Sequence, residues 1–180
     1  DVLVRSQAAT ELLLRGKRRG LTPSTLTLID DMLQEVRALA ETPASVSGAL
    51  DRRVGWVVRG YRSEVDGSVQ PYLVRLPDDY DPDAAYPLVV SLHYLEPGLT
   101  KAGWVARQFR QSWSLEPESL PLRSPMVELQ PFGRGNNWYR GLGEDDVLQA
   151  IAAARQRYNL DPDRVYLTGG SMGGTGAWYL

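Results

Sequence analysis

The chain has 180 residues, of which 43% are hydrophobic and 23% are charged, values that are ordinary for a folded domain with one sizeable core. Its net charge of −2 does not favour a nucleic acid as a partner, and the absence of cysteine excludes disulfides, thiolate metal sites and a cysteine nucleophile. No apolar stretch approaches the roughly 18 residues that a membrane span needs. We therefore expect a soluble protein, and composition does not decide between a cytoplasmic and an exported one.

Two helices are predicted at the start of the chain. The first lies within residues 1–19, where apolar residues recur at helical spacing: Val4, Ala8, Leu12 and Leu13. Thr22 and Pro23 suit the cap and the first position of a second helix, whose apolar stripe is Leu26, Ile29, Leu33, Val36 and Ala40. We expect a helical hairpin over residues 1–42 and a linker over 43–53. A cap over a site, a surface for a partner and simple packing all fit such a hairpin.

Residues 54–180 have the pattern of an α/β fold. Two strand-like runs, 56–61 and 69–76, are joined across Asp66-Gly67, a dipeptide that favours the tight turn of an antiparallel hairpin. Strands and helices then alternate: strand 88–92, helix 101–111, strand 126–130, helix 144–158 and strand 165–169. This order predicts a mostly parallel sheet preceded by an antiparallel hairpin. The apolar strand 88–92 is expected to be buried on both faces.

Acidic residues near two of these elements have structural interpretations. Asp145 and Asp146 open the helix predicted at 144–158, where they complement the positive end of the helix dipole. The inward side chains of that helix are predicted to be Val147, Leu148, Ile151 and Ala154. The Asp-Pro-Asp sequence at 161–163 predicts a turn before the last strand.

The most informative stretch is 165–176, which reads Val-Tyr-Leu-Thr-Gly-Gly-Ser-Met-Gly-Gly-Thr-Gly. Its order is a strand, a tight turn and a helix, and the turn contains a Gly-x-Ser-x-Gly pattern centred on Ser171. In that setting the pattern indicates a nucleophile elbow, which holds the serine in a strained conformation with its hydroxyl exposed. The alternatives are a glycine-rich turn that only packs a helix onto a strand, and a phosphate-binding loop, whose glycine and lysine spacing does not occur in this chain.

The sequence Gly-Gly-Ser-Met-Gly-Gly at 169–174, preceded by Asp-Pro-Asp-Arg-Val at 161–165, resembles the α/β-hydrolase superfamily. The most similar groups are esterases of the dienelactone-hydrolase, polyhydroxyalkanoate-depolymerase and feruloyl-esterase type, together with prolyl-oligopeptidase-like hydrolases. The resemblance covers about residues 54–180. It implies an acyl-enzyme on Ser171, no cofactor, no metal, and an oxyanion hole formed by the backbone N–H groups of Met172 and Tyr94. These families usually have His-Gly where this chain has His93-Tyr94, so the tyrosine departs from their pattern.

His93 is the only histidine of the chain and lies 78 positions before Ser171. Because the triad order in this fold is serine, acid, histidine, His93 is interpreted as a support of the oxyanion loop. The acid and the base are then expected beyond Leu180. We accordingly interpret the chain as the N-terminal part of a longer protein, inactive by itself, since the helix that begins at Met172 has no stop signal before Leu180.

The loop over 131–140 carries candidates for substrate contact, because ligands of open α/β sheets bind beyond the carboxyl ends of the strands. Trp138 and Tyr139 are predicted either to form a pocket wall or to pack against a neighbouring helix, and Asn136 offers a polar contact. The leading hypothesis is a serine hydrolase of small-molecule or polymeric carboxylic esters. The alternatives are a prolyl-oligopeptidase-like serine peptidase and a non-catalytic binding protein on the same fold. The sequence does not indicate an oligomeric state.

Overall fold

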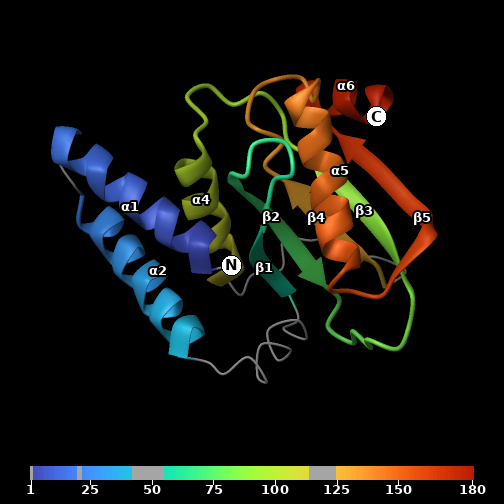
Figure 1. Ribbon diagram of the computed structural model, residues 1–180, viewed down its shortest axis with the longest axis horizontal. Coiled ribbons are helices and arrows are strands. Elements are labelled where there is room, and N and C mark those ends of the chain that lie inside the picture. The colour runs from blue at the N-terminus through green and yellow to red at the C-terminus, as the bar shows by residue number, and fades with distance from the viewer. Residues whose placement is uncertain (1, 20–21, 42–54, 114–124) are drawn as a thin grey trace.

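The computed structural model describes residues 2–19, 22–41, 55–113 and 125–180, so the predicted linker over 43–53 lies outside the described residues. In chain order the elements are α1 (Val2–Arg19), α2 (Pro23–Glu41), β1 (Gly55–Arg62), β2 (Val69–Leu76), β3 (Tyr86–Leu92), α4 (Lys101–Trp113), β4 (Val127–Pro131), α5 (Leu142–Arg155), β5 (Leu160–Gly169) and α6 (Met172–Tyr179) (Figure 1). Each predicted helix and strand is present, and the ends differ by a few residues. No helix of the described residues is long and apolar enough to cross a bilayer.

The five strands form one sheet in the order β1-β2-β4-β3-β5. β2 pairs antiparallel with β1 and with β4, whereas β3 pairs parallel with both β4 and β5. Four strands therefore run in one direction and β2 runs against them. This arrangement confirms the predicted α/β class, with an antiparallel hairpin ahead of a mostly parallel sheet.

The turn between β1 and β2 is closed as its sequence predicts. Gly67 has a φ of +67°, a region that glycine enters without steric cost. The backbone N–H of Ser63 donates to the carbonyl of Ser68 at 2.8 Å, and Asp66 Oδ1 accepts from the Ser68 N–H at 3.0 Å. The dipeptide Asp66-Gly67 thus sets the register of the hairpin, in which Arg62 pairs with Val69.

β5 is longer than predicted and contains the Asp-Pro-Asp segment 161–163, which was expected to be a separate turn. The register with β3 shifts there, because Tyr86 pairs with Leu160 while Leu88 pairs with Val165. The extra residues bulge out of the ladder, with Asp161 Oδ1 accepting from the Asp163 N–H at 2.9 Å. The Asp-Pro-Asp segment thus forms a local turn-like hydrogen bond, as expected. The prediction that it precedes the last strand is wrong, because it lies within β5.

One face of the sheet packs against α5. The buried residues of α5 are Gly143, Asp146, Val147, Ala150, Ile151 and Ala154. The inward position predicted for Leu148 is wrong, since its side chain is 54% exposed and Ala150 faces the sheet instead. β3 is buried only at alternate residues, so the prediction of burial on both faces is also wrong. The reason is that the helices on the opposite face lie over β1 and β2.

The opposite face packs against α1 and α4, and α2 packs against these two helices (Figure 1). Val4 and Ala8 of α1, with Met32 of α2, share one core cluster with residues of the sheet and of α4, which include Val58, Leu73, Trp104 and Val105. Thr22 caps α2 as predicted, because its Oγ1 accepts from the Thr25 N–H at 3.3 Å. The apolar stripe predicted for α2 is wrong at Leu26, whose exposed fraction is 48%. Leu28 and Met32, which were not predicted to face inward, are buried.

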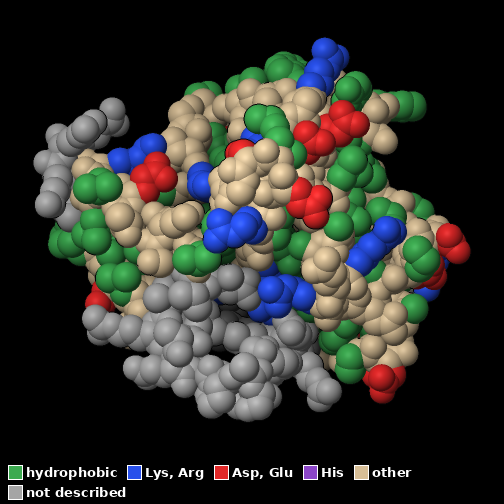
Figure 2. Space-filling view, viewed as in Figure 1, with side chains coloured by type: hydrophobic (Ala, Val, Ile, Leu, Met, Phe, Trp, Pro, Cys, Tyr) green, Lys and Arg blue, Asp and Glu red, His purple; other side chains and the backbone are tan. Residues whose placement is uncertain are grey.

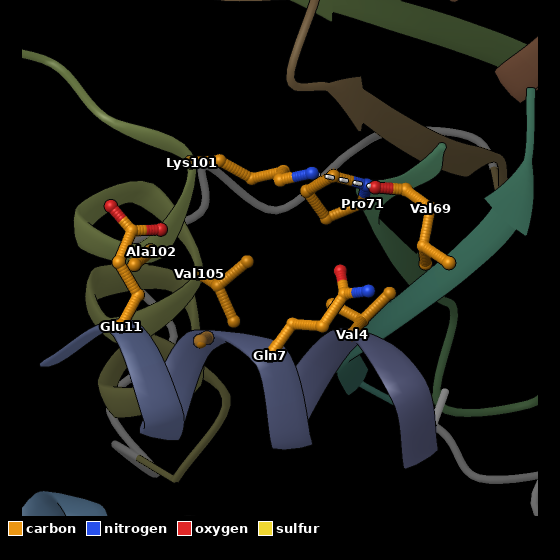
Figure 3. A pocket seen from close by; sticks show the side chains of 9 residues that line it. Val4, Gln7, Glu11, Val69, Pro71, Lys101, Ala102 and Val105 are labelled. Atoms are coloured by element: carbon orange, nitrogen blue, oxygen red, sulfur yellow. Dashed lines mark hydrogen bonds between the residues drawn. The ribbon is translucent and has the colours of Figure 1, made fainter. Parts of the chain in front are cut away.

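A small hollow lies where α1 meets β2 and α4 (Figure 3). Its lining is mostly apolar, and the residues are Val4, Gln7, Ala8, Glu11, Val69, Pro71, Lys101, Ala102 and Val105. Lys101 reaches across its mouth and donates from Nζ to the carbonyl oxygen of Val69 at 2.9 Å. The helical hairpin therefore shares its core with the sheet but does not fill every space against it.

Charged side chains are interspersed on the surface. On the face drawn in Figure 2, Lys and Arg side chains are interspersed with Asp and Glu side chains. This mixing agrees with the small net charge of −2.

We expect Met32→Ala to lower the free energy of unfolding by about 2–4 kcal/mol, because the side chain is fully buried and its removal leaves a cavity. The matched control is Leu26→Ala on the same helix, which should change that free energy by less than about 0.5 kcal/mol since Leu26 is exposed. Urea denaturation of both variants measures the difference. Equal effects would show that α2 does not pack as described.

Candidate active site

Ser171 occupies the turn between β5 and α6. Its backbone has φ 53° and ψ −119°, a region that costs a residue with a side chain about 1–3 kcal/mol. The turn is closed by the N–H of Gly173, which donates to Gly170 O at 2.9 Å, and by the N–H of Thr175, which donates to Ser171 O at 3.0 Å. Ser171 is exposed, and its hydroxyl has no hydrogen-bond partner among the described residues. The predicted order of strand, turn and helix is thus observed, with the serine at its apex.

Two glycines allow the strand and the helix to approach each other at this turn. A Cβ on Gly169 would lie 2.5 Å from the carbonyl carbon of Gly173, and one on Gly173 would lie 2.7 Å from the carbonyl carbon of Leu92. Both distances are shorter than any real side chain permits, so these positions need glycine. A Cβ on Gly170 would meet nothing within 4 Å. The steric demand therefore falls two residues before and two residues after Ser171, as the motif predicts.

We expect Gly173→Ala to destabilise the protein by about 1–3 kcal/mol, because backbone atoms of β3 cannot yield to the new methyl group without a shift of α6. Gly170→Ala is the control with the same change in composition, and we expect it to alter the free energy of unfolding by less than about 0.5 kcal/mol. Chemical denaturation of the two proteins gives both values. A Gly173→Ala variant as stable as Gly170→Ala would contradict the close approach.

The backbone amides expected to form an oxyanion hole belong to Met172 and Tyr94. Met172 is the first residue of α6, so its N–H has no acceptor within the helix. Tyr94 follows the end of β3, whose last residue, Leu92, pairs with Gly169 at the end of β5. The two segments thus leave neighbouring strands at the same edge of the sheet. The Tyr94 side chain is 61% exposed and lies outside the core.

Both ring nitrogens of His93 lie within hydrogen-bonding distance of backbone carbonyl oxygens, and a neutral ring, which has one N–H, donates to one of them. Nδ1 lies 2.8 Å from the carbonyl oxygen of Tyr94, and Nε2 lies 3.0 Å from that of Phe132. A general base must offer one nitrogen as an acceptor, whereas both partners here are themselves acceptors. In this arrangement His93 braces the loop after β3 against the loop after β4, and it has no nitrogen directed to the proton of Ser171.

The three residues proposed for substrate contact lie in different settings. Trp138 is 45% exposed, whereas Tyr139 is fully buried and packs against α6, where a Cβ on Gly176 would come within 2.5 Å of its ring. Tyr139 therefore has the packing role that the sequence left open. Asn136 is exposed, but both ends of its amide are bonded to the backbone of Glu96.

A partly buried network of charged side chains holds the loop after β4, and the sequence did not predict it. Arg134 donates from Nε to Asp146 Oδ1 at 3.2 Å and from Nη1 to Asp66 Oδ2 at 2.7 Å. Tyr61 donates its hydroxyl proton to the same Oδ1 of Asp146 at 2.5 Å. The network joins α5, the loop after β4 and the turn between β1 and β2.

The helix-start role predicted for Asp146 is wrong. Its side chain faces the sheet and the residue is 1% exposed, because it lies on the buried face of α5, four residues before Ala150. Burial raises the pKa of the Asp146 carboxyl, while the Tyr61 hydroxyl and the Arg134 charge act in the opposite direction. Its Oδ2 is buried without a hydrogen-bond partner within the described part of the chain. The sequence signal that could have revealed the contact between Asp146 and Arg134 is the position of Asp146, which falls at helical spacing on the apolar face of α5.

The pKa of Asp146 predicts a pH dependence of stability. A group whose pKa is raised by folding stabilises the protein at low pH, and that contribution is lost as pH rises above the ordinary carboxyl value of about 4 and through the raised pKa. Asp146→Asn does not titrate. We therefore expect the free energy of unfolding of the wild type, minus that of Asp146→Asn, to decrease as the pH rises above about 4. Urea denaturation at several pH values tests this, and a difference that grows with pH would mean that Arg134 outweighs burial.

Two hollows formed by described residues lie away from Ser171. One is the space between α1, β2 and α4. The other is an open hollow between β1 and α5, and it is lined by Gly60, Tyr61, Arg62, Glu64, Gln149, Ala152, Ala153, Gln156 and Arg157. Neither hollow is lined by Ser171 or Tyr94.

No protein-family model matches the chain, and no curated protein matches it significantly. Among solved structures it is similar to a ferulic acid esterase, with 22% identity, a TM-score of 0.50, and coverage of 68% of this chain and 51% of that one. A thermostable esterase has 30% identity, a TM-score of 0.47, and coverage of 68% and 36%. A putative dipeptidyl aminopeptidase IV from Bacteroides ovatus has 15% identity, a TM-score of 0.45, and coverage of 67% and 18%. The chain spans about half or less of these structures, and the first likeness shows the fold.

Proposed function

Because the chain has the α/β-hydrolase fold, we propose that it belongs to a serine hydrolase that acts on carboxylic esters through Ser171. The observation that carries the proposal is the conformation of Ser171, which is exposed at positive φ on a turn from strand to helix. Such strain persists only where the surrounding backbone imposes it, and it is common at catalytic residues. A turn that served packing alone would have no need to place a side chain there.

In the proposed reaction the Ser171 oxygen attacks the acyl carbon of the ester, and the carbonyl oxygen takes the negative charge. The N–H groups of Met172 and Tyr94 donate to that oxygen. A base accepts the serine proton and returns it to the leaving alcohol, which gives an acyl-enzyme that water then hydrolyses. No cofactor or metal takes part in these steps.

We propose that the base of this reaction is not His93, because its two ring nitrogens lie 2.8 and 3.0 Å from backbone carbonyl oxygens. No other histidine occurs among these 180 residues. We propose that the histidine and its acid partner are supplied by residues outside this chain, so that residues 1–180 alone do not turn over esters. Of the residues considered for contact with the substrate, Trp138 remains a candidate because it is exposed. The Tyr94 side chain is a further candidate, since it is exposed as well.

The decisive variant is Ser171→Ala in the full-length protein. We expect labelling by a fluorophosphonate probe to be abolished and the rate of ester hydrolysis to fall by about 10⁴-fold or more, because the nucleophile is gone. Thr168→Ala removes another exposed hydroxyl from the same strand end and should leave both signals unchanged.

Labelling of Ser171→Ala at the wild-type rate would refute the assignment, and a wild type that does not react at all would favour a binding protein. Parallel turnover of a short-chain aryl ester and an aminoacyl-proline amide separates an esterase from a peptidase. We expect the ester to be the better substrate.

A further inference from the structure

The loop after β3 is held at Glu96 by the side chain of Asn136. Asn136 Oδ1 accepts from the Glu96 N–H at 3.1 Å, and its Nδ2 donates to the Glu96 carbonyl oxygen at 2.7 Å. One amide thus satisfies both backbone groups of one residue, as a paired strand would. The Glu96 carboxylate is in turn bonded to Arg107 of α4. Glu96 is therefore fixed from two sides, by the loop after β4 and by α4.

The same loop is held at His93, three residues earlier. The Tyr139 hydroxyl donates to the His93 carbonyl oxygen at 3.1 Å, and His93 Nε2 lies 3.0 Å from the carbonyl oxygen of Phe132. Tyr139 is itself immobilised, because its ring lies against Gly133 and against Gly176 of α6. One buried side chain thus contacts both the helix that begins after Ser171 and the start of the loop after β3.

These contacts bracket Tyr94. Its own side chain is 61% exposed and that of Leu95 is 42% exposed, so burial does not fix the backbone between them. The fixed points are the His93 carbonyl on one side and both backbone groups of Glu96 on the other. The place of the Tyr94 N–H is therefore determined by side chains of the loop after β4.

We infer that Asn136 and Tyr139 are positioning residues, which set the Tyr94 amide at the distance from Ser171 that a developing oxyanion requires. The inference rests on the proposed function, in which that amide is an oxyanion donor. It gives both residues a role other than contact with the substrate, because the Asn136 amide and the Tyr139 hydroxyl are already hydrogen-bonded to backbone groups of the protein. Such a role matters for rate, since a misplacement of about 1 Å at a reacting centre can lower it by about 100-fold.

Two variants of the full-length protein test this, Asn136→Ala and Tyr139→Phe, of which the second removes only the hydroxyl. Each has a matched control far from Ser171. Asn159→Ala removes an exposed amide that donates to the Pro82 carbonyl at 3.2 Å, and Tyr86→Phe removes a hydroxyl that accepts from the Asp81 N–H at 2.9 Å. Two quantities are measured: hydrogen exchange of residues 93–98, and the second-order rate of fluorophosphonate labelling at Ser171 together with kcat and KM for an aryl ester.

We expect faster exchange over residues 93–98 in both test variants, with labelling and kcat reduced about 10- to 100-fold and KM changed little. The controls should match the wild type. Unchanged exchange would overturn the inference whether or not Ser171 reacts, and faster exchange with unchanged labelling would overturn it by showing that the loop does not set the donor. A wild type that fails to label at Ser171 overturns the proposed function and with it the oxyanion role, while exchange still decides whether the two side chains hold the loop.

Discussion

The close approach of α6 to the ends of β3 and β5 is the constraint on which the site depends. Gly169 and Gly173 lie so close to each other and to Leu92 that neither position has room for a side chain. The absence of side chains there lets α6 pack directly against the ends of the two strands. The turn between β5 and α6 is too tight for ordinary backbone angles, and Ser171 accordingly has a strained φ of 53°. The exposure of the hydroxyl follows from the packing of its neighbours.

Helices pack on both faces of the sheet whose last strand leads into this turn. On one face α5 buries an apolar ridge that also contains Asp146, whose carboxylate ties the helix to Arg134 and Tyr61. On the other, the N-terminal helices share their core with α4 and with β1 and β2. The helical hairpin is thus continuous with the core of the fold, and α4, on which it rests, directly follows the loop that carries Tyr94.

The loop after β4 connects these parts. Arg134 fastens it to α5, Tyr139 fastens it to α6, and Asn136 fastens it to the loop after β3. Three of its residues, Arg134, Trp138 and Tyr139, have positive φ values, so its path is set by these contacts and not by local preference. A network of this kind keeps two loops in register without regular secondary structure.

Local patterns in the sequence were sufficient for the helices and strands, for the Asp66-Gly67 turn and for the position of Ser171, because each depends on neighbours within a few residues. They failed where burial is decided by partners distant in the chain: Leu148 and Leu26 were placed inside, and Asp146 was placed at a helix start. The tie between Asn136 and Glu96 likewise joins residues 40 positions apart. The sequence by itself therefore determined the fold class and the position of Ser171 in its turn. Only the tertiary structure decided which side chains hold the surrounding loops in place, since such contacts exist only once the strands lie side by side.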